Sequence, residues 1–183
     1  MQIVMYFIGT MLFIGLIGWI LKFFRTFRKV TISHLENWLS NSMEELESTL
    51  DQIGFVHHSI SNDKKSQNFR RNDGEVIYMN TKLQTGKKSI TYQRLQRKDP
   101  HYFLNHLIES GYMEIEEPNF SALSLDKFDI QSETLNGQKV YVKYDYQDFI
   151  HSFCRLFSKG DYWVIHERGN ASNSFIAITL CRK

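Results

Sequence analysis

The chain contains little cysteine. Only Cys154 and Cys181 occur among its 183 residues, and neither has a second cysteine close to it. A zinc module needs several closely spaced ligands, so this spacing excludes one. Both cysteines stand in apolar stretches, which is typical of buried thiols in a reducing compartment, and a disulfide between them is not needed.

The chain also lacks the local motifs of common catalytic sites. It has no G-x-S-x-G elbow, phosphate-binding loop, Rossmann glycine fingerprint or H-E-x-x-H pair. Adjacent His57 and His58 fall on an expected strand, so their side chains point to opposite faces and cannot chelate one ion. His101 and His106 are five positions apart, which is off one helical face. The sequence therefore predicts no catalytic residue, no metal site and no cofactor.

One pair of residues leaves open whether the chain has a catalytic nucleophile. His151 and Cys154 are three apart on an expected helix, where an imidazole would reach and activate a thiol. The apolar residues around Cys154 favour the other interpretation, in which the thiol is part of the core.

Net charge is small, at +2 with neutral histidines. It is distributed in blocks: residues 31–55 carry five acids and no Lys or Arg, residues 56–98 carry ten cations against three acids, and residues 99–148 carry ten acids against three cations. A near-neutral domain does not indicate nucleic acid as a partner. The blocks either pair with each other in the fold or mark separate contact faces.

No charged residue precedes Lys22. The nineteen residues from Ile3 to Leu21 would span about 28 Å as a helix, close to the ~30 Å hydrocarbon core of a bilayer. A cleaved signal peptide would need a basic start and a small-residue cleavage site, and a core helix would need a polar face. We therefore expect a transmembrane anchor at 1–24, a juxtamembrane segment with an amphipathic helix at 25–54, and a globular domain at 55–183.

The cations after this apolar run predict its orientation. Lys22, Arg25, Arg28 and Lys29 all follow the run, and such residues stay preferentially on the cytoplasmic side. The sequence thus predicts a single-pass protein of the plasma (inner) membrane, with its N-terminus outside, its domain in the cytoplasm and the lipid bilayer as a partner.

Periodicity in the remaining chain predicts an α+β fold of antiparallel hairpins with about three helices packed on the sheet. Apolar residues recur every three or four positions between 32 and 53, with a break near a capping box at Ser42 and Glu45. Asn136-Gly137 is a favoured hairpin turn. Further helices are expected at 99–111 and 146–158, and strands at 55–60, 75–80, 89–95, 128–134, 139–144, 162–167 and 175–181. The sequence also contains a weak internal echo of two units, each predicted to have the order strand, turn, strand, helix and strand. Whether this echo is a true repeat stays open.

A run of cations between residues 64 and 98 is the most distinctive surface feature expected. It either keeps loops and strand edges soluble or contacts an acidic protein or an anionic surface. Together with the four cations near the apolar run, the candidate contact residues are Lys22, Arg25, Arg28, Lys29, Lys64, Lys65, Arg70, Arg71, Lys87, Lys88, Arg94, Arg97 and Lys98.

Three functions remain open from the sequence. The leading hypothesis is a membrane-anchored, non-enzymatic binding domain at the inner membrane face, which captures a protein partner, assembles with a complex or neutralises a toxin. The alternatives are a tethered hydrolase with a dispersed site, and a sensor that binds a small molecule. Self-association of the chain stays open.

Overall fold

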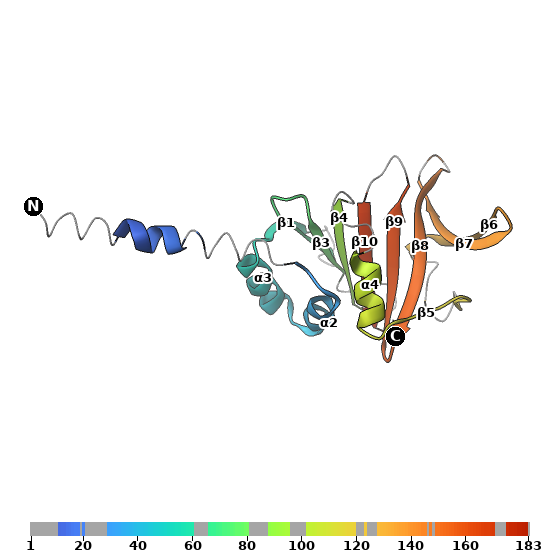
Figure 1. Cartoon of the computed structure of the whole chain (residues 1–183), viewed down its shortest axis with the longest axis horizontal. Helices are drawn as coiled ribbons and strands as arrows, with labels where there is room; N and C mark the ends of the chain where they lie inside the picture. The colour runs from blue at the N-terminus through green and yellow to red at the C-terminus, as the bar shows by residue number, and fades with distance from the viewer. Residues whose placement is uncertain are drawn as a thin grey trace, which may run out of the picture.

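The computed structural model describes residues 11–18, 20, 29–60, 66–80, 88–95, 102–119, 123, 128–145, 147, 149–170 and 175–182. Ten strands form one sheet in which every pairing is antiparallel. Nine of them follow the order β1-β2-β3-β4-β10-β9-β8-β7-β6, and β5 pairs with β8 beside this path (Figure 1). The strands are β1 Val56–Ile60, β2 Ser66–Arg70, β3 Val76–Asn80, β4 Ser89–Leu95, β5 Met113–Glu114, β6 Ile130–Leu135, β7 Gln138–Tyr144, β8 Ile150–Lys159, β9 Tyr162–Gly169 and β10 Phe175–Arg182.

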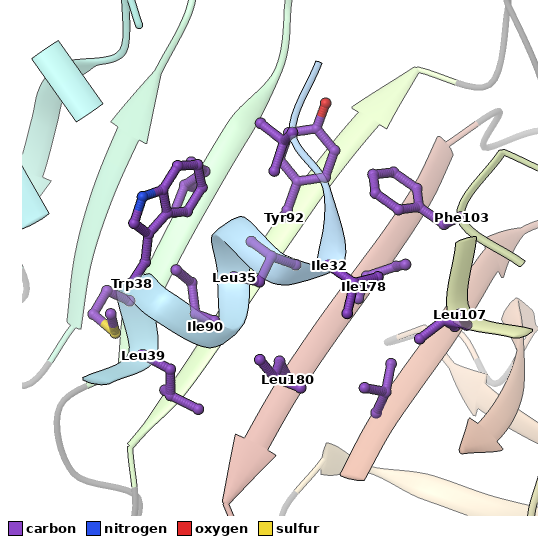
Figure 2. Close-up of a cluster of buried hydrophobic side chains, with 14 of the residues drawn as sticks. Ile32, Leu35, Trp38, Leu39, Ile90, Tyr92, Phe103, Leu107, Ile178 and Leu180 are labelled. Atoms are coloured by element: carbon purple, nitrogen blue, oxygen red, sulfur yellow. The ribbon is translucent and has the colours of Figure 1, made fainter. Parts of the chain in front are cut away.

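Three helices cover one face of this sheet: α2 Ile32–Ser40, α3 Met43–Gln52 and α4 Tyr102–Glu109. Thr31 and Ser42 cap the first two through complete capping boxes, which satisfy backbone N–H groups that a helix start leaves without partners. The apolar stripe of α2, with Leu35, Trp38 and Leu39, packs on β4 and β10 (Figure 2).

The helix-side core is continuous across the strands. Figure 2 shows Ile90 and Tyr92 from β4 beside Ile178 and Leu180 from β10, with Phe103 of α4 at their edge. Tyr92 and Phe103 meet edge to face, with their ring centroids 5.2 Å apart. Fully burying a leucine or isoleucine side chain stabilises the fold by about 1.5–3 kcal/mol, so this cluster is the main source of stability.

The opposite side of the sheet, which we call the distal face, carries a second and smaller core. It lies at the β7–β9 end and consists of Ile130, Tyr141, Cys154, Leu156, Trp163, Ile165 and Cys181, with Ile115, Leu123 and Phe128 packed against it. Elsewhere on the distal face, over β4, β10 and β9, polar side chains replace apolar ones, which positions the site described below.

The membrane prediction is wrong. Among the residues for which a structure is described, no helix combines the length and the apolarity that crossing a bilayer requires. The expected span at 3–21 lies mostly outside those residues, because only 11–18 and 20 are described.

The placement that depended on this helix is corrected with it. The described residues form an antiparallel ten-stranded sheet with short helices, and none of these helices is a transmembrane anchor. A single-pass membrane protein with an outside N-terminus and a cytoplasmic domain is therefore not supported. The helices α2 and α3, expected in a juxtamembrane segment, belong to the same core as the sheet.

The helix predicted at 146–158 is also wrong, because residues 150–159 form strand β8. Burial on β8 alternates through Ser152, Cys154 and Leu156, while the large ring of Phe153 is 41% exposed. A polar residue, Ser152, is buried here, and an apolar residue, Phe153, is exposed. The apolar residues of this stretch therefore recur at a spacing that resembles a helix. In the first unit of the internal echo, the helix α4 occupies the place that the strand β8 occupies in the second unit. The internal echo is therefore not a structural repeat.

Several other predictions are confirmed. The break between the first two helices falls at Asn41 and Ser42. The hairpin at Asn136-Gly137 joins β6 to β7, and β9 pairs with β10. Strand β2 was missed because its sequence, SQNFR, offers a single buried apolar residue, Phe69.

Candidate functional site

A polar cavity of about 440 Å³ opens on the distal face. Its walls come from strands β3, β4, β7, β8, β9 and β10 and from the segment before β6, and its lining residues are Asn80, Thr91, Gln93, Phe128, Lys143, His151, Glu167, Phe175, Ala177 and Thr179. We call it the distal cavity.

A buried ion pair forms one side of the distal cavity. Glu167 lies on the central strand β9, where it faces Cys154 on β8 and Ala177 on β10. Lys143 reaches across from β7, and its Nζ lies 2.5 Å from Glu167 Oε2, with side-chain exposures of 20% and 9%. A buried charge without a partner costs free energy, and Lys143 spares the Glu167 carboxylate this cost.

Ser152 holds the second oxygen of this carboxylate. Its Oγ donates to Glu167 Oε1 at 2.7 Å, and the residue is fully buried. Two donors on one carboxylate fix its orientation, and they leave further lone pairs of the oxygens available toward the cavity.

Hydroxyl and amide groups form the opposite side. Thr91 and Thr179 are register partners on β4 and β10, and their hydroxyls lie 2.9 Å apart. Asn80 is positioned by Ser66, whose Oγ donates to Asn80 Oδ1 at 2.7 Å. These groups alternate with buried apolar residues of the helix side because neighbouring residues on a strand point to opposite faces.

Aromatic rings complete the walls. Phe175 contacts the His151 ring, with centroids 5.3 Å apart, and Phe128 meets Trp163 edge to face at 5.4 Å. The distal cavity thus combines apolar ring surface with an ion pair and several hydrogen-bonding groups.

The proposed pairing of His151 with Cys154 gains no support. Both residues lie on strand β8, three positions apart, and Cys154 is buried in the distal core. Burial, with a further contribution from the negative charge of Glu167, raises the pKa of the Cys154 thiol to about 12. The group therefore stays a protonated thiol at neutral pH, whereas a nucleophile needs the thiolate.

No metal site is apparent in the part of the chain that the structure describes, where no three His, Cys, Asp or Glu side chains come together. His166 and Glu167, adjacent on β9, fall on opposite faces as expected for a strand, because His166 faces Ile178 of the helix-side core and Glu167 faces Ala177.

The cations predicted as contact residues are only partly described. Eight of them lie outside the described residues: Lys22, Arg25, Arg28, Lys64, Lys65, Lys87, Arg97 and Lys98. Arg71 is not a surface cation, because its side chain is 3% exposed, pairs with Asp73 and Glu75, and lies 4.8 Å over the Phe55 ring.

The other four described cations do not converge. Lys88 Nζ donates to the backbone oxygen of Asn41 at 3.3 Å, at the start of β4. Arg94, near the far end of that strand, shares the helix side with Tyr92, and Arg70 is exposed at the end of β2. Lys29 is exposed ahead of α2. Within the described residues, the structure brings no basic surface together.

The distal cavity was missed by sequence reasoning, although a signal for it exists. Polar residues alternate with apolar ones on β4, as in Ile90-Thr91-Tyr92-Gln93, and again on β10, as in Ile178-Thr179-Leu180. The apolar residues of these two strands are buried on the helix side of the sheet. A polar stripe on their opposite side therefore indicates a face that lines a cavity. Comparisons of the chain with protein-family models, with curated proteins and with solved structures found no match.

Proposed function

We propose that this chain is a non-enzymatic binding domain and that the distal cavity holds a small, uncharged ligand rich in hydrogen-bonding groups. The observation that carries the proposal is the convergence of a buried ion pair and a hydroxyl pair on one cavity. A sheet face without a ligand to bind would be more stable with apolar side chains in these positions, because buried polar groups contribute little net stability.

The dimensions support a small ligand. A volume of about 440 Å³ falls in the range of roughly 300–1,000 Å³ typical of small-molecule sites, which are apolar clefts with a few well-placed polar groups. Phe128 and Phe175 supply the apolar surface, and Thr91, Thr179 and Gln93 supply donors and acceptors.

The charges support an uncharged ligand. Lys143 and Glu167 neutralise each other on one side of the cavity, so a ligand of either sign would be attracted by one of them and repelled by the other. A neutral ring with a polar rim fits this lining, since one face stacks on aromatic side chains while hydroxyl or amide groups meet the polar wall. Monosaccharides and nucleosides have this chemistry.

Binding without turnover is favoured by the state of the nucleophile candidates. The Ser152 hydroxyl is buried and donates its proton to Glu167 Oε1. The Cys154 thiol is protonated at neutral pH. Neither residue is therefore activated for attack in the way that acyl- or phosphoryl-transfer enzymes require.

The proposal is tested by ligand-observed NMR with panels of monosaccharides and nucleosides at about 1 mM, a concentration that detects weak binding. We expect at least one member to show saturation transfer and to be recovered chemically unchanged after long incubation. Thr179→Val removes a cavity hydroxyl at nearly constant shape, and it should weaken binding roughly tenfold, the usual effect of one lost hydrogen bond.

The matched control is Thr134→Val, which makes the same change on exposed β6, outside the distal cavity. It should leave binding unaltered. The proposal fails if no panel member binds, or if both threonine variants affect binding equally. Conversion of a bound compound into product would instead favour the hydrolase hypothesis.

A further inference from the structure

The Lys143–Glu167 ion pair offers a ligand an acceptor and a donor side by side. An ionised carboxylate has about four acceptor positions on its two oxygens, and an ammonium group has about three donors. Ser152 occupies one position on Glu167 Oε1, and Lys143 occupies one on Oε2. Both charged residues line the distal cavity, so a ligand there meets acceptor positions of the carboxylate beside N–H groups of the ammonium.

The charges limit which donors bind to this carboxylate. A cationic donor, such as a guanidinium or ammonium group, would be repelled by Lys143, whose Nζ lies 2.5 Å from Glu167 Oε2. A neutral N–H group satisfies the carboxylate but cannot accept a hydrogen bond from the ammonium. A hydroxyl does both, because it has one donor and two acceptor lone pairs. The ion pair therefore matches hydroxyl groups better than any other neutral donor.

The orientation of the carboxylate favours two hydroxyls at once. Ser152 and Lys143 hold one oxygen each, so both oxygens of Glu167 keep a fixed position. Two hydroxyls on neighbouring carbons of a ligand can each donate to one of these oxygens. When the carbons belong to a ring, rotation between them is restricted, and the two hydroxyls lose less freedom on binding than they would on a flexible chain.

The strand register leaves room for such a ring. Ala177 on β10 lies between Gln93 on β4 and Glu167 on β9, in one row across the sheet. Two strand spacings of about 4.8 Å place the backbones of Gln93 and Glu167 roughly 10 Å apart, and the short methyl group of Ala177 leaves the space between them open. A ring over Ala177 then has the carboxylate on one side and the Gln93 amide on the other.

We infer, on the basis of the function proposed above, that the distal cavity recognises a vicinal diol on a neutral ring. The Glu167 carboxylate accepts a hydrogen bond from each hydroxyl of the diol, Lys143 donates to one of them, and Ala177 forms the floor beneath the ring. Monosaccharides and the ribose of nucleosides both carry this group, and the test distinguishes these two sources.

Compounds that differ by one hydroxyl test the inference on the native chain. Each member of the two panels that binds is compared with an analogue without neighbouring ring hydroxyls, for example adenosine with 2′-deoxyadenosine, or a methyl mannoside with its 3-deoxy derivative. Isothermal titration should give a dissociation constant roughly tenfold or more lower for the intact diol, because its second hydroxyl bonds to a charged group. A preference among the nucleosides identifies ribose as the source, and one among the sugars identifies a monosaccharide.

Variants assign this preference to the ion pair. Lys143→Met combined with Glu167→Gln removes both charges, so the intact and the deoxy compound should bind with about equal affinity. Thr179→Val acts on the opposite side of the cavity and should weaken both compounds by the same factor. The control, Lys139→Met combined with Glu133→Gln, makes the same two changes on β7 and β6 outside the distal cavity and should alter neither affinity.

The outcomes separate this inference from the function on which it rests. If no member of the panels binds, the proposed function fails, and the diol inference fails with it. If a compound binds the native chain as tightly without its second hydroxyl, the diol inference alone is overturned, and binding in the distal cavity stands. A charge-free double variant that keeps the tenfold preference overturns the inference as well.

Discussion

The ion pair of the distal cavity makes a quantitative prediction for stability. Lys143→Met keeps most of the aliphatic side chain but removes the ammonium group, which lies 2.5 Å from Glu167 Oε2. The carboxylate then remains buried without its ionic partner, while the Ser152 hydroxyl still donates to it. Breaking a buried pair in this way typically costs about 3–5 kcal/mol.

The expected value here is slightly smaller. Lys143 is 20% exposed and Ser152 still satisfies one oxygen, so we expect Lys143→Met to lower the free energy of unfolding by about 2–4 kcal/mol. For a domain of this size that corresponds to a loss of roughly 5–15 °C in Tm. The double variant Lys143→Met with Glu167→Gln removes both charges and keeps an acceptor for Ser152. It should lie within about 1 kcal/mol of the native chain.

Urea denaturation measures these free energies, with fluorescence of the buried Trp38 and Trp163 as the probe. Lys139→Met is the control, because it removes an exposed lysine from the same strand and should change stability by about 0.5 kcal/mol or less. A loss below about 1 kcal/mol for Lys143→Met, or a double variant as unstable as the single one, would refute the reasoning.

Two further predictions concern the thiol and a helix contact. The pKa of Cys154, raised from 9.0 to about 12, means that the unfolded chain loses this proton first as pH rises. The contribution of this thiol to the free energy of unfolding is therefore fully present below about pH 9 and falls between pH 9 and 12, by at most about 1.4 kcal/mol per pH unit. Cys154→Ala should remove this contribution to the pH dependence, which denaturation curves recorded across the range measure. Tyr112→Phe deletes the hydroxyl that donates to Glu36 Oε1 of α2 at 2.7 Å and should cost about 1–2 kcal/mol in urea denaturation. Tyr162→Phe, whose hydroxyl meets exposed Arg182 at 3.4 Å, should cost nearly nothing; equal losses would contradict the assignment.

Local chemistry made part of this fold predictable. Asn136-Gly137 marks a turn because both residues tolerate positive φ, and Ser42 with Glu45 marks a helix start because each side chain satisfies the other's backbone. Such signals act within four residues. Strand β8 was misread because its burial depends on partners from β5, β7 and β9, and those partners decide that Ser152 is buried and Phe153 is not.

The apolar run near the N-terminus shows a related limit. Hydropathy of residues 3–21 measures transfer from water into an apolar phase, and it indicated a bilayer because the nineteen residues have no polar face. The described part of that run, residues 11–18 and 20, is helical, and no described helix meets the requirements of a span. Composition thus predicted an environment that the described structure does not support.

The distal cavity could not be assembled from the sequence. Lys143 and Glu167 are far apart along the chain and meet because β7 and β9 both pair with β8. Thr91 and Thr179 are still farther apart and meet through the register of β4 with β10. Alternating letters indicate which residues share a face of one strand, but only strand order brings faces together.

The place of β10 in the sheet has a consequence for biosynthesis. This strand is the last of the ten to leave the ribosome, yet it lies between β4 and β9, and among the described strands it alone pairs with both the β1–β4 group and the β5–β9 group. Until it emerges, the two groups of strands have no ladder between them, and each exposes an open edge to chaperones and to aggregation. A stop codon before residue 175 would leave two unjoined halves, so quality control during translation is expected to depend on the final strand.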